Sequence, residues 1–195
     1  MSKSFRILAA GLITVLAGAA SAQTASLSKP DYYAGAGLGV YNKYSLTCAA
    51  GAACDRTADL GGKIYGGADF GSFGVEALAF GLKSAQGSLK NGSGLTVPGS
   101  VSMSGVGVVG VMPLLNAQDF SLKGRLGLGY VRGKASLASG VQDDSSVRPL
   151  VGLGASYALN KQVSLNADWD RFEAKYSGSG KTHANMLSVG VSYKF

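Results

Sequence analysis

The sequence is short of proline, cysteine and histidine, and each shortage narrows what the protein can be. Its 195 residues include 4 prolines, 2 cysteines and 1 histidine. The two cysteines have no nearby cysteine or histidine that would complete a zinc site, so we expect no metal. The chain has few prolines and is 46% hydrophobic. Disordered chains are rich in proline and poor in aromatic and β-branched residues, so this composition argues against disorder.

Long apolar runs are also missing after residue 22. A transmembrane helix needs about 20 apolar residues, whereas a membrane-crossing strand needs only about 9–11. The uncharged stretch 7–20 is too short to span a bilayer; it follows Lys3 and Arg6 and precedes Ala20-Ser21-Ala22. This pattern predicts a secretory signal peptide over residues 1–22 and a single exported domain over residues 23–195.

Acidic residues are outnumbered by basic ones, 11 to 18, and the formal net charge is +7. A basic chain can bind nucleic acid, but an exported chain rarely meets it, so we expect no nucleic-acid partner. We expect the basic residues to face the phosphates of outer-membrane lipid and lipopolysaccharide, or to pair with acids inside a barrel.

The last residues of the chain alternate strictly between two kinds of side chain. Side chains of a strand point to opposite faces with a period of two, so this segment has one apolar and one small or polar face. The apolar positions are Leu187, Val189, Val191, Tyr193 and Phe195, and the others are Ser188, Gly190, Ser192 and Lys194. In a soluble fold the apolar face would meet a core; in a transmembrane barrel it would meet lipid.

Seven earlier segments alternate in the same way, although the fourth of them is less regular. They span residues 32–44, 63–70, 73–83, 101–112, 120–130, 148–157 and 163–170. In the first, the pattern places Tyr41 on the inner face. In the fourth, Val106, Val108 and Val109 occupy both faces, and the pattern does not separate inside from outside.

Connector lengths alternate as well. Long polar stretches lie at about 45–60, 84–99, 135–146 and 174–183, and short turns at about 71–72, 113–119 and 160–161. Outer-membrane barrels have long extracellular loops and short periplasmic turns. The sequence therefore predicts an all-β fold, an eight-stranded antiparallel up-and-down transmembrane β-barrel in the outer membrane. A soluble lipocalin-like barrel, apolar inside and polar outside, is the main alternative.

Several stretches in this order resemble the small outer-membrane β-barrel superfamily of OmpA-like and opacity-type porin family proteins. They are residues 33–39, 74–77, 127–130, 151–155, 165–172 and 189–195. The resemblance covers essentially the whole exported part, without the peptidoglycan-binding domain of OmpA proper. It implies that the last strand, with Val191, Tyr193 and Phe195, is the assembly signal read by the barrel-assembly machinery.

The predicted inner face carries charges of both signs. We expect a lumen charge network of Lys63, Asp69, Glu76, Lys123, Arg125, Arg148, Asp168 and Asp170. An eight-stranded barrel is just wide enough to be filled by its own side chains, so we favour an ion-paired plug over a narrow polar pore. Asp168 and Asp170 share a face as paired catalytic carboxylates do, but nearby arginines favour a structural role.

Catalysis is not expected. Some small barrels modify lipid A, and lipid A deacylases carry a His-x-Ser pattern; here His183 is followed two residues later by Asn185, which is not a nucleophile. We therefore predict no catalytic residue, no cofactor and no metal. The expected function is a structural or surface-interaction role through the extracellular loops, with an unidentified ligand. A small-solute porin is the alternative, ahead of a lipid A-modifying enzyme.

Cys48 and Cys54 lie in the first predicted loop, separated by five residues. In an oxidising compartment two such cysteines can close a short loop. We predict a disulfide between them.

Overall fold

The computed structural model describes residues 29–45, 56–58, 60–90, 96–137, 140–176 and 180–195. The predicted signal peptide over residues 1–22 and the predicted Cys48–Cys54 disulfide lie outside these ranges. Among the described residues, no helix has the length and apolar character needed to cross a membrane. The described strands are β1 (Asp31–Tyr44), β2 (Gly61–Asp69), β3 (Gly74–Lys90), β4 (Thr96–Ala117), β5 (Phe120–Leu137), β6 (Gly140–Ala158), β7 (Val163–Tyr176) and β8 (Gly180–Lys194).

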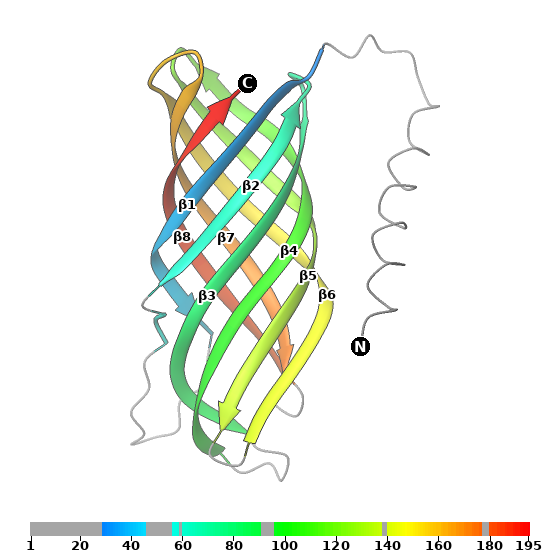
Figure 1. Ribbon diagram of the computed structural model, residues 1–195, viewed down its shortest axis with the longest axis vertical. Helices are drawn as coiled ribbons and strands as arrows, with labels where there is room; N and C mark the ends of the chain where they lie inside the picture. Colours follow the sequence, from blue (N-terminus) through cyan, green and yellow to red (C-terminus); the bar gives the residue numbers. More distant parts are fainter. Residues whose placement is uncertain (1–28, 46–55, 59, 91–95, 138–139, 177–179) are drawn as a thin grey trace, which may run out of the picture.

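The eight strands close into a barrel (Figure 1). Each strand pairs antiparallel with the next, and β8 pairs with β1 from Tyr33↔Lys194 to Tyr44↔Ala184. Closure satisfies the backbone groups that an open sheet edge would leave unpaired. The predicted eight-stranded up-and-down barrel is confirmed.

The two ends of the barrel differ, and Figure 1 shows them at its top and bottom. At the top, which we call the turn end, lie the connections β2–β3, β4–β5 and β6–β7, together with the start of β1 and the end of β8. There the Phe195 amide donates a hydrogen bond to the Tyr32 carbonyl at 2.9 Å. The opposite end, which we call the loop end, holds the other four connections.

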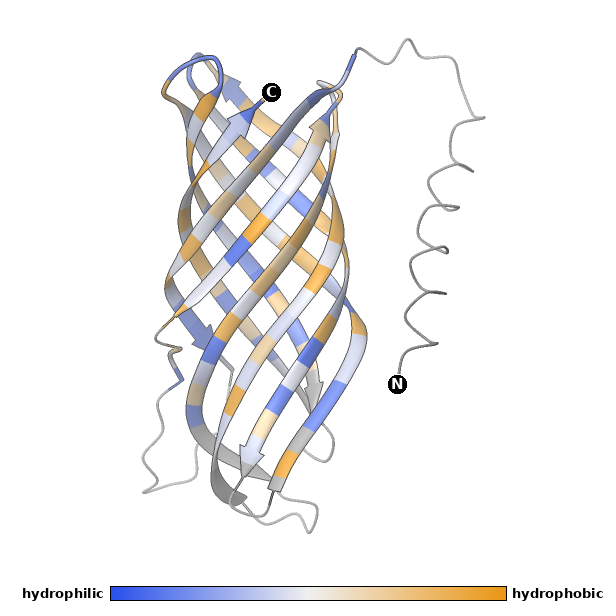
Figure 2. Ribbon diagram, in the orientation of Figure 1, coloured by the Kyte–Doolittle hydropathy of each residue, from blue (hydrophilic) through white to orange (hydrophobic). Residues whose placement is uncertain are grey.

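The outer face is apolar and the inner face is largely polar over the middle of the barrel. On β5, Leu126 and Leu128 are 68% and 61% exposed, whereas Arg125 between Gly124 and Leu126 is 3% exposed. The same alternation runs along β6 and β7, and Figure 2 shows blue and orange positions alternating along the strands. The predicted inward and outward faces of 120–130, 148–157 and 163–170 are confirmed, and the lipocalin-like alternative is wrong.

Aromatic side chains border the apolar outer surface at the turn end. Phe120 and Tyr157 lie opposite each other on β5 and β6, and Tyr32 and Tyr193 are also exposed there. At the other border, Tyr130 and Tyr41 are about half exposed. Such aromatic girdles mark the two interfaces of a lipid-exposed band.

Several strands are longer than the alternation predicts, and this corrects the predicted loops. Most of the predicted loops 84–99, 135–146 and 174–183 is strand: β3 and β4 pair as far as Lys90↔Thr96, and β5 and β6 as far as Leu137↔Gly140. The predicted turn 113–119 contracts to Gln118 and Asp119, with Gln118 at φ 51°. Beyond the lipid the outer face can be polar, so the ladder continues where no apolar outer face marks it in the sequence.

A register shift corrects the predicted position of Tyr41. In the β1–β8 pair, Gly39 and Tyr41 face consecutive residues, Ser188 and Leu187. The extra residue is a β-bulge, which reverses the phase of the strand. Tyr41 therefore points outward and is 50% exposed, while Asn42 and Tyr44 are buried inside the barrel.

Candidate functional site

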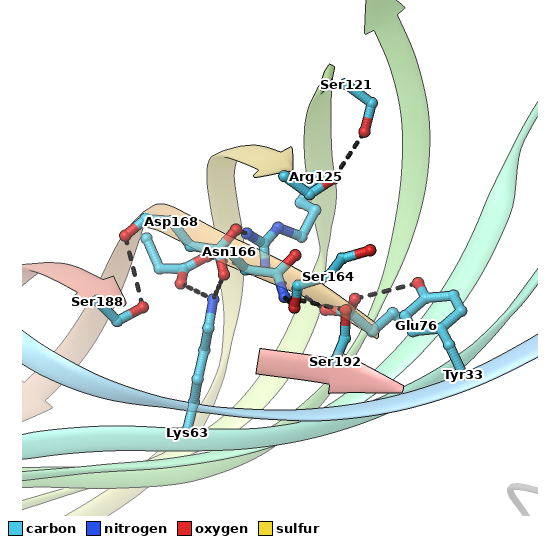
Figure 3. A network of polar contacts seen from close by, with 12 residues as sticks. Tyr33, Lys63, Glu76, Ser121, Arg125, Ser164, Asn166, Asp168, Ser188 and Ser192 are labelled. Atoms are coloured by element: carbon cyan, nitrogen blue, oxygen red, sulfur yellow. Dashed lines mark hydrogen bonds and ion pairs between the residues drawn. The ribbon is translucent and has the colours of Figure 1, made fainter. Parts of the chain in front are cut away.

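Five charged side chains meet in the middle of the barrel, and we call them the ionic cluster (Figure 3). They are Lys63 on β2, Glu76 on β3, Arg125 on β5, and Asp168 and Asp170 on β7. The Lys63 Nζ lies 2.5 Å from Asp170 Oδ2 and 3.1 Å from Asp168 Oδ2. All five side chains are at most 7% exposed.

Arg125 links the acids of the ionic cluster across the barrel. Its Nη1 lies 3.5 Å from Glu76 Oε1 and 3.7 Å from Asp170 Oδ1, and its Nη2 donates a hydrogen bond to Asp168 Oδ1. One guanidinium thus contacts carboxylates from β3 and from β7. Its fork of donors suits such multiple contacts better than the single ammonium of lysine.

Glycines on the neighbouring strand leave room for these carboxylates. Gly152 lies opposite Asp170 and Gly154 lies opposite Asp168 in the β6–β7 register. A Cβ at Gly152 would collide with Asp170 Oδ1, and a Cβ at Gly154 would collide with Asp168 Oδ1. The carboxylates therefore lie flat over bare backbone, where the basic side chains reach them from across the lumen.

A polar layer lies between the ionic cluster and the turn end. The Tyr33 hydroxyl donates a hydrogen bond to Glu76 Oε2 at 3.1 Å, and the Asn166 amide donates to Ser192 Oγ at 2.9 Å (Figure 3). Ser121 and Ser156 share a hydrogen bond of 2.7 Å. A cavity of about 190 Å³ occupies this mouth of the barrel, with Asp69 and Lys123 among its lining residues.

Three residues of the predicted lumen charge network lie outside the ionic cluster. Asp69 ends β2 in an exposed position and accepts a hydrogen bond from the Gly71 amide at 2.7 Å, so it shapes the turn. The Lys123 ammonium lies 5.7 Å from the centre of the Tyr33 ring. Arg148 pairs with Glu173 at 3.2 Å near the loop end.

An apolar layer lies inside the barrel on the loop-end side of the ionic cluster, and the alternation along the strands did not predict it. Phe172 is the next inward residue after Asp170, and its ring stacks on Phe80 at 3.7 Å between centroids and 12° between planes. Leu150 lies opposite Phe172. The rest of this buried layer includes Tyr44, Leu82, Val101, Met103, Val131 and Met186. The valines that left the faces of the fourth predicted segment unassigned are not part of this layer, because Val106 and Val108 are exposed and Val109 lies opposite Glu76.

Beyond this layer the strands no longer form one continuous sheet and separate into two groups. We call the ends of these two groups at the loop end the rim. The β6–β7 pairing stops at Leu150↔Phe172, and the β1–β2 pairing stops at Gly39↔Gly61. Strands β3 to β6 continue together on one side, and β7, β8 and β1 on the other. On the outer face of the first group, Arg132 binds both carboxylate oxygens of Asp143, at 2.8 and 2.9 Å from its Nε.

His183 lies on the rim, opposite Glu173 on β7. Partial burial and the nearby Arg171 guanidinium both disfavour the charged imidazole and lower the pKa of His183 below its ordinary value. Asn185 lies opposite Arg171. No group of three or more potential metal ligands occurs among the described residues.

A family model, the outer membrane protein beta-barrel domain, matches residues 10–195. The chain belongs to this family. It is an outer-membrane protein, and its loop end is therefore extracellular, because short turns of such barrels face the periplasm.

Solved outer-membrane barrels show the same fold at low sequence identity. Neisserial surface protein A is 17% identical with a TM-score of 0.61, covering 84% of this chain and 97% of that one. Ail of Yersinia pestis is 15% identical with a TM-score of 0.55, covering 86% and 100%. A major outer membrane protein of Thermus thermophilus is also 15% identical, with a TM-score of 0.52 and the same coverage. No curated protein sequence matches this chain.

Proposed function

We propose that this outer-membrane barrel is a sealed, non-enzymatic surface protein that acts through its extracellular rim. The observation that carries the proposal is the double closure of the lumen. The ionic cluster fills the middle of the barrel with side chains at most 7% exposed, and the apolar layer follows it immediately. A solute entering from the cavity at the turn end would meet both.

The two closures resist passage for different reasons. Opening the ionic cluster would separate buried opposite charges, which is costly where the surroundings are poor in water. Opening the apolar layer would require water to enter a space lined by aromatic and aliphatic side chains, and such constrictions act as barriers to ions. The small-solute porin, the alternative, needs both layers to move together.

Single-channel recording in planar lipid bilayers tests the sealed barrel. We expect no steady conductance from the folded protein, with folding checked by its heat-modifiable migration on gels. Steady openings that change when Arg125 or Glu76 is neutralised would overturn the proposal in favour of the porin.

Because the lumen is sealed in this proposal, the extracellular rim is the surface on which a ligand would bind. Strands carry it beyond the lipid band, so its side chains stand on paired backbone, and surface residues on a rigid scaffold commonly bind ligands. Lys43, Arg132 and Arg171 are exposed there. Ail, a protein of similar fold, is known in complex with the heparin analogue sucrose octasulfate, which supports an anionic surface ligand for this rim as well.

Binding of intact expressing cells to heparin-coated beads tests that role. We expect retention that falls when Lys43 and Arg171 are both changed to Gln and is unaffected when the periplasmic-end Lys29 and Lys161 are changed instead. Equal retention of the two variants would contradict a rim ligand of this chemistry.

The absence of lipid-modifying activity has its own test. We expect the mass spectra of lipid A to be unchanged when the protein is overexpressed.

A further inference from the structure

A groove runs over the outer face of β3, β4 and β5 just beyond the apolar band. It has a volume of about 690 Å³. Two lysines and a set of hydroxyl groups dominate its polar lining, namely Lys83, Ser84, Ser102, Ser104, Lys134 and Ser136. This polar groove lies on the side of the barrel, at the border with the outer leaflet, and not at the mouth of the lumen.

A β-bulge brings the two lysines to the same level. The β3–β4 register jumps from Leu82↔Met103 to Ala85↔Val101, so Lys83 and Ser84 both fall opposite Ser102 and both are exposed. Lys134 lies opposite Ser102 on its other side. Neighbouring strands are about 4.8 Å apart, so the two lysine Cα atoms stand roughly 10 Å apart, within reach of one phosphate group for side chains of this length.

The charge of the polar groove is not neutralised by the described residues around it. Neither Lys83 nor Lys134 forms an ion pair with a described carboxylate. Asp143 lies opposite Lys134 in the β5–β6 register and interacts with it electrostatically, but both carboxylate oxygens are bound by Arg132, so one acid faces two basic side chains. The pair of lysines therefore retains a positive field that favours a doubly charged anion.

An apolar groove continues from the polar groove down the lipid-facing surface. It has a volume of about 620 Å³. It shares Leu38, Gly62 and Gly81 with the polar groove and is lined further by Ala36, Ile64 and Ala79. Small residues hollow the surface here, and a Cβ placed on Gly81 would meet no atom within 4 Å. Together the two grooves fit an amphiphilic ligand, because an anion site adjoins a channel for a hydrocarbon chain.

We propose that this continuous groove binds a phosphorylated glycolipid of the outer leaflet. The phosphate lies between Lys83 and Lys134, sugar hydroxyls meet the serines of β4 and β5, and one acyl chain lies over Gly62 and Gly81. Basic pockets at the lipid interface recognise phosphorylated headgroups in this way. A zwitterionic phospholipid fits less well, because its own cation would be placed beside the two lysines. The site lies on the outer wall, so it stands whether or not the lumen conducts.

Binding of lipid A to the folded full-length protein in detergent micelles tests the proposal. The probes are bisphosphorylated lipid A, the same lipid after dephosphorylation, and inorganic phosphate, with bound lipid measured by native mass spectrometry. We expect Lys83→Gln with Lys134→Gln to weaken binding of bisphosphorylated lipid A by roughly 25-fold, since each basic contact near a lipid headgroup contributes about fivefold. The affinity of the unaltered protein for dephosphorylated lipid A should be lower than its affinity for bisphosphorylated lipid A by a similar factor.

Matched controls separate the site from general charge and general hydrophobicity. Lys29→Gln with Lys161→Gln removes the same charge at the turn end and should leave binding unchanged. Gly81→Leu places a side chain in the apolar groove from a Cβ that meets no atom within 4 Å and should weaken binding, whereas Gly110→Leu on the lipid-facing side of β4 should not. Heat-modifiable migration shows that each variant is folded.

Three results would overturn the proposal. The first is equal affinity of the two double lysine variants for bisphosphorylated lipid A. The second is equal binding of the phosphorylated and dephosphorylated lipids, which would assign the groove to hydrocarbon alone. Competition by inorganic phosphate at millimolar concentration would identify a free anion, in place of a lipid, as the ligand.

Discussion

Arg125 and Asp168 stand 43 residues apart in the chain and form an ion pair at the centre of the barrel, where their side chains are 2% and 4% exposed. Each also contacts a further member of the ionic cluster: Arg125 reaches Glu76, and Asp168 reaches Lys63. The pair joins β5 to β7 over the intervening β6, and the two further contacts extend it to β3 and β2. Removing one partner would leave the other charge buried with fewer opposite charges beside it.

We predict that Asp168→Asn destabilises the folded barrel by about 3–5 kcal/mol, the usual cost of breaking a buried pair. Urea unfolding in detergent micelles measures the change. The exposed pair Arg132–Asp143 is the control, because surface ion pairs contribute little, and Asp143→Asn should leave the unfolding midpoint unchanged. Equal midpoints for both variants would contradict a central role for the ionic cluster.

Gly154→Ala should also destabilise the barrel, by about 1–3 kcal/mol, because its Cβ meets Asp168 Oδ1 and lies 2.7 Å from Arg125 Nη2. Gly81→Ala adds the same methyl group in open space on the outer face and serves as the control. A comparison of the two unfolding midpoints in the same micelles decides the matter. A loss as large at Gly81 would point to backbone effects in place of crowding at the carboxylate.

Phe80→Ala should cost about 3–5 kcal/mol, because it removes half of the stacked pair with Phe172 and leaves a cavity in the apolar layer. Replacing both rings opens only one of the two closures, so the double variant should stay silent in planar-bilayer recording while the ionic cluster is intact. Steady ion flow through this double variant would show that the ionic cluster does not close the lumen.

The single histidine of the chain allows a direct test of the rim. The pKa of His183 is lowered, so its imidazole should titrate below its ordinary value of 6.5. A lowered folded-state pKa means that the unfolded chain binds the proton first. Any stability linked to His183 is therefore complete above pH 6.5 and declines as the pH falls below it. Nuclear magnetic resonance titration of the ring protons gives the midpoint, and Arg171→Gln should raise it.

Phe195→Ala should reduce the amount of folded protein in the outer membrane of cells without a matching loss of stability in micelles. Phe195 is 76% exposed and contacts the Tyr193 ring at 5.3 Å between centroids, so its packing contribution is small. Quantifying the heat-modifiable form in membrane fractions and after refolding in vitro separates assembly from stability. A parallel loss in both would contradict the predicted assembly signal.

The sequence by itself determined the barrel and its membrane band. The alternation of Leu126, Leu128 and Tyr130 with Arg125, Gly127 and Gly129 is visible along one strand, because a strand has a period of two and only one face met lipid. It also indicated which charges point inward. It did not show where the ladder ends, because beyond the lipid many outer residues of β3 to β6 are polar and the apolar outer face that marks a lipid-facing strand is lost. Nor did it show that Tyr41 changes face through a bulge.

Only the tertiary structure decided which inward residues meet. Lys63, Glu76, Arg125 and Asp168 come from four strands, and their contact depends on strand stagger and barrel closure, which are long-range properties of the backbone. The same closure stacked Phe80 on Phe172 and placed Lys83 and Lys134 on either side of Ser102. Periodicity along one strand assigns a face to a residue, but the height and neighbours of that residue in the barrel follow from the pairing of strands distant in the chain.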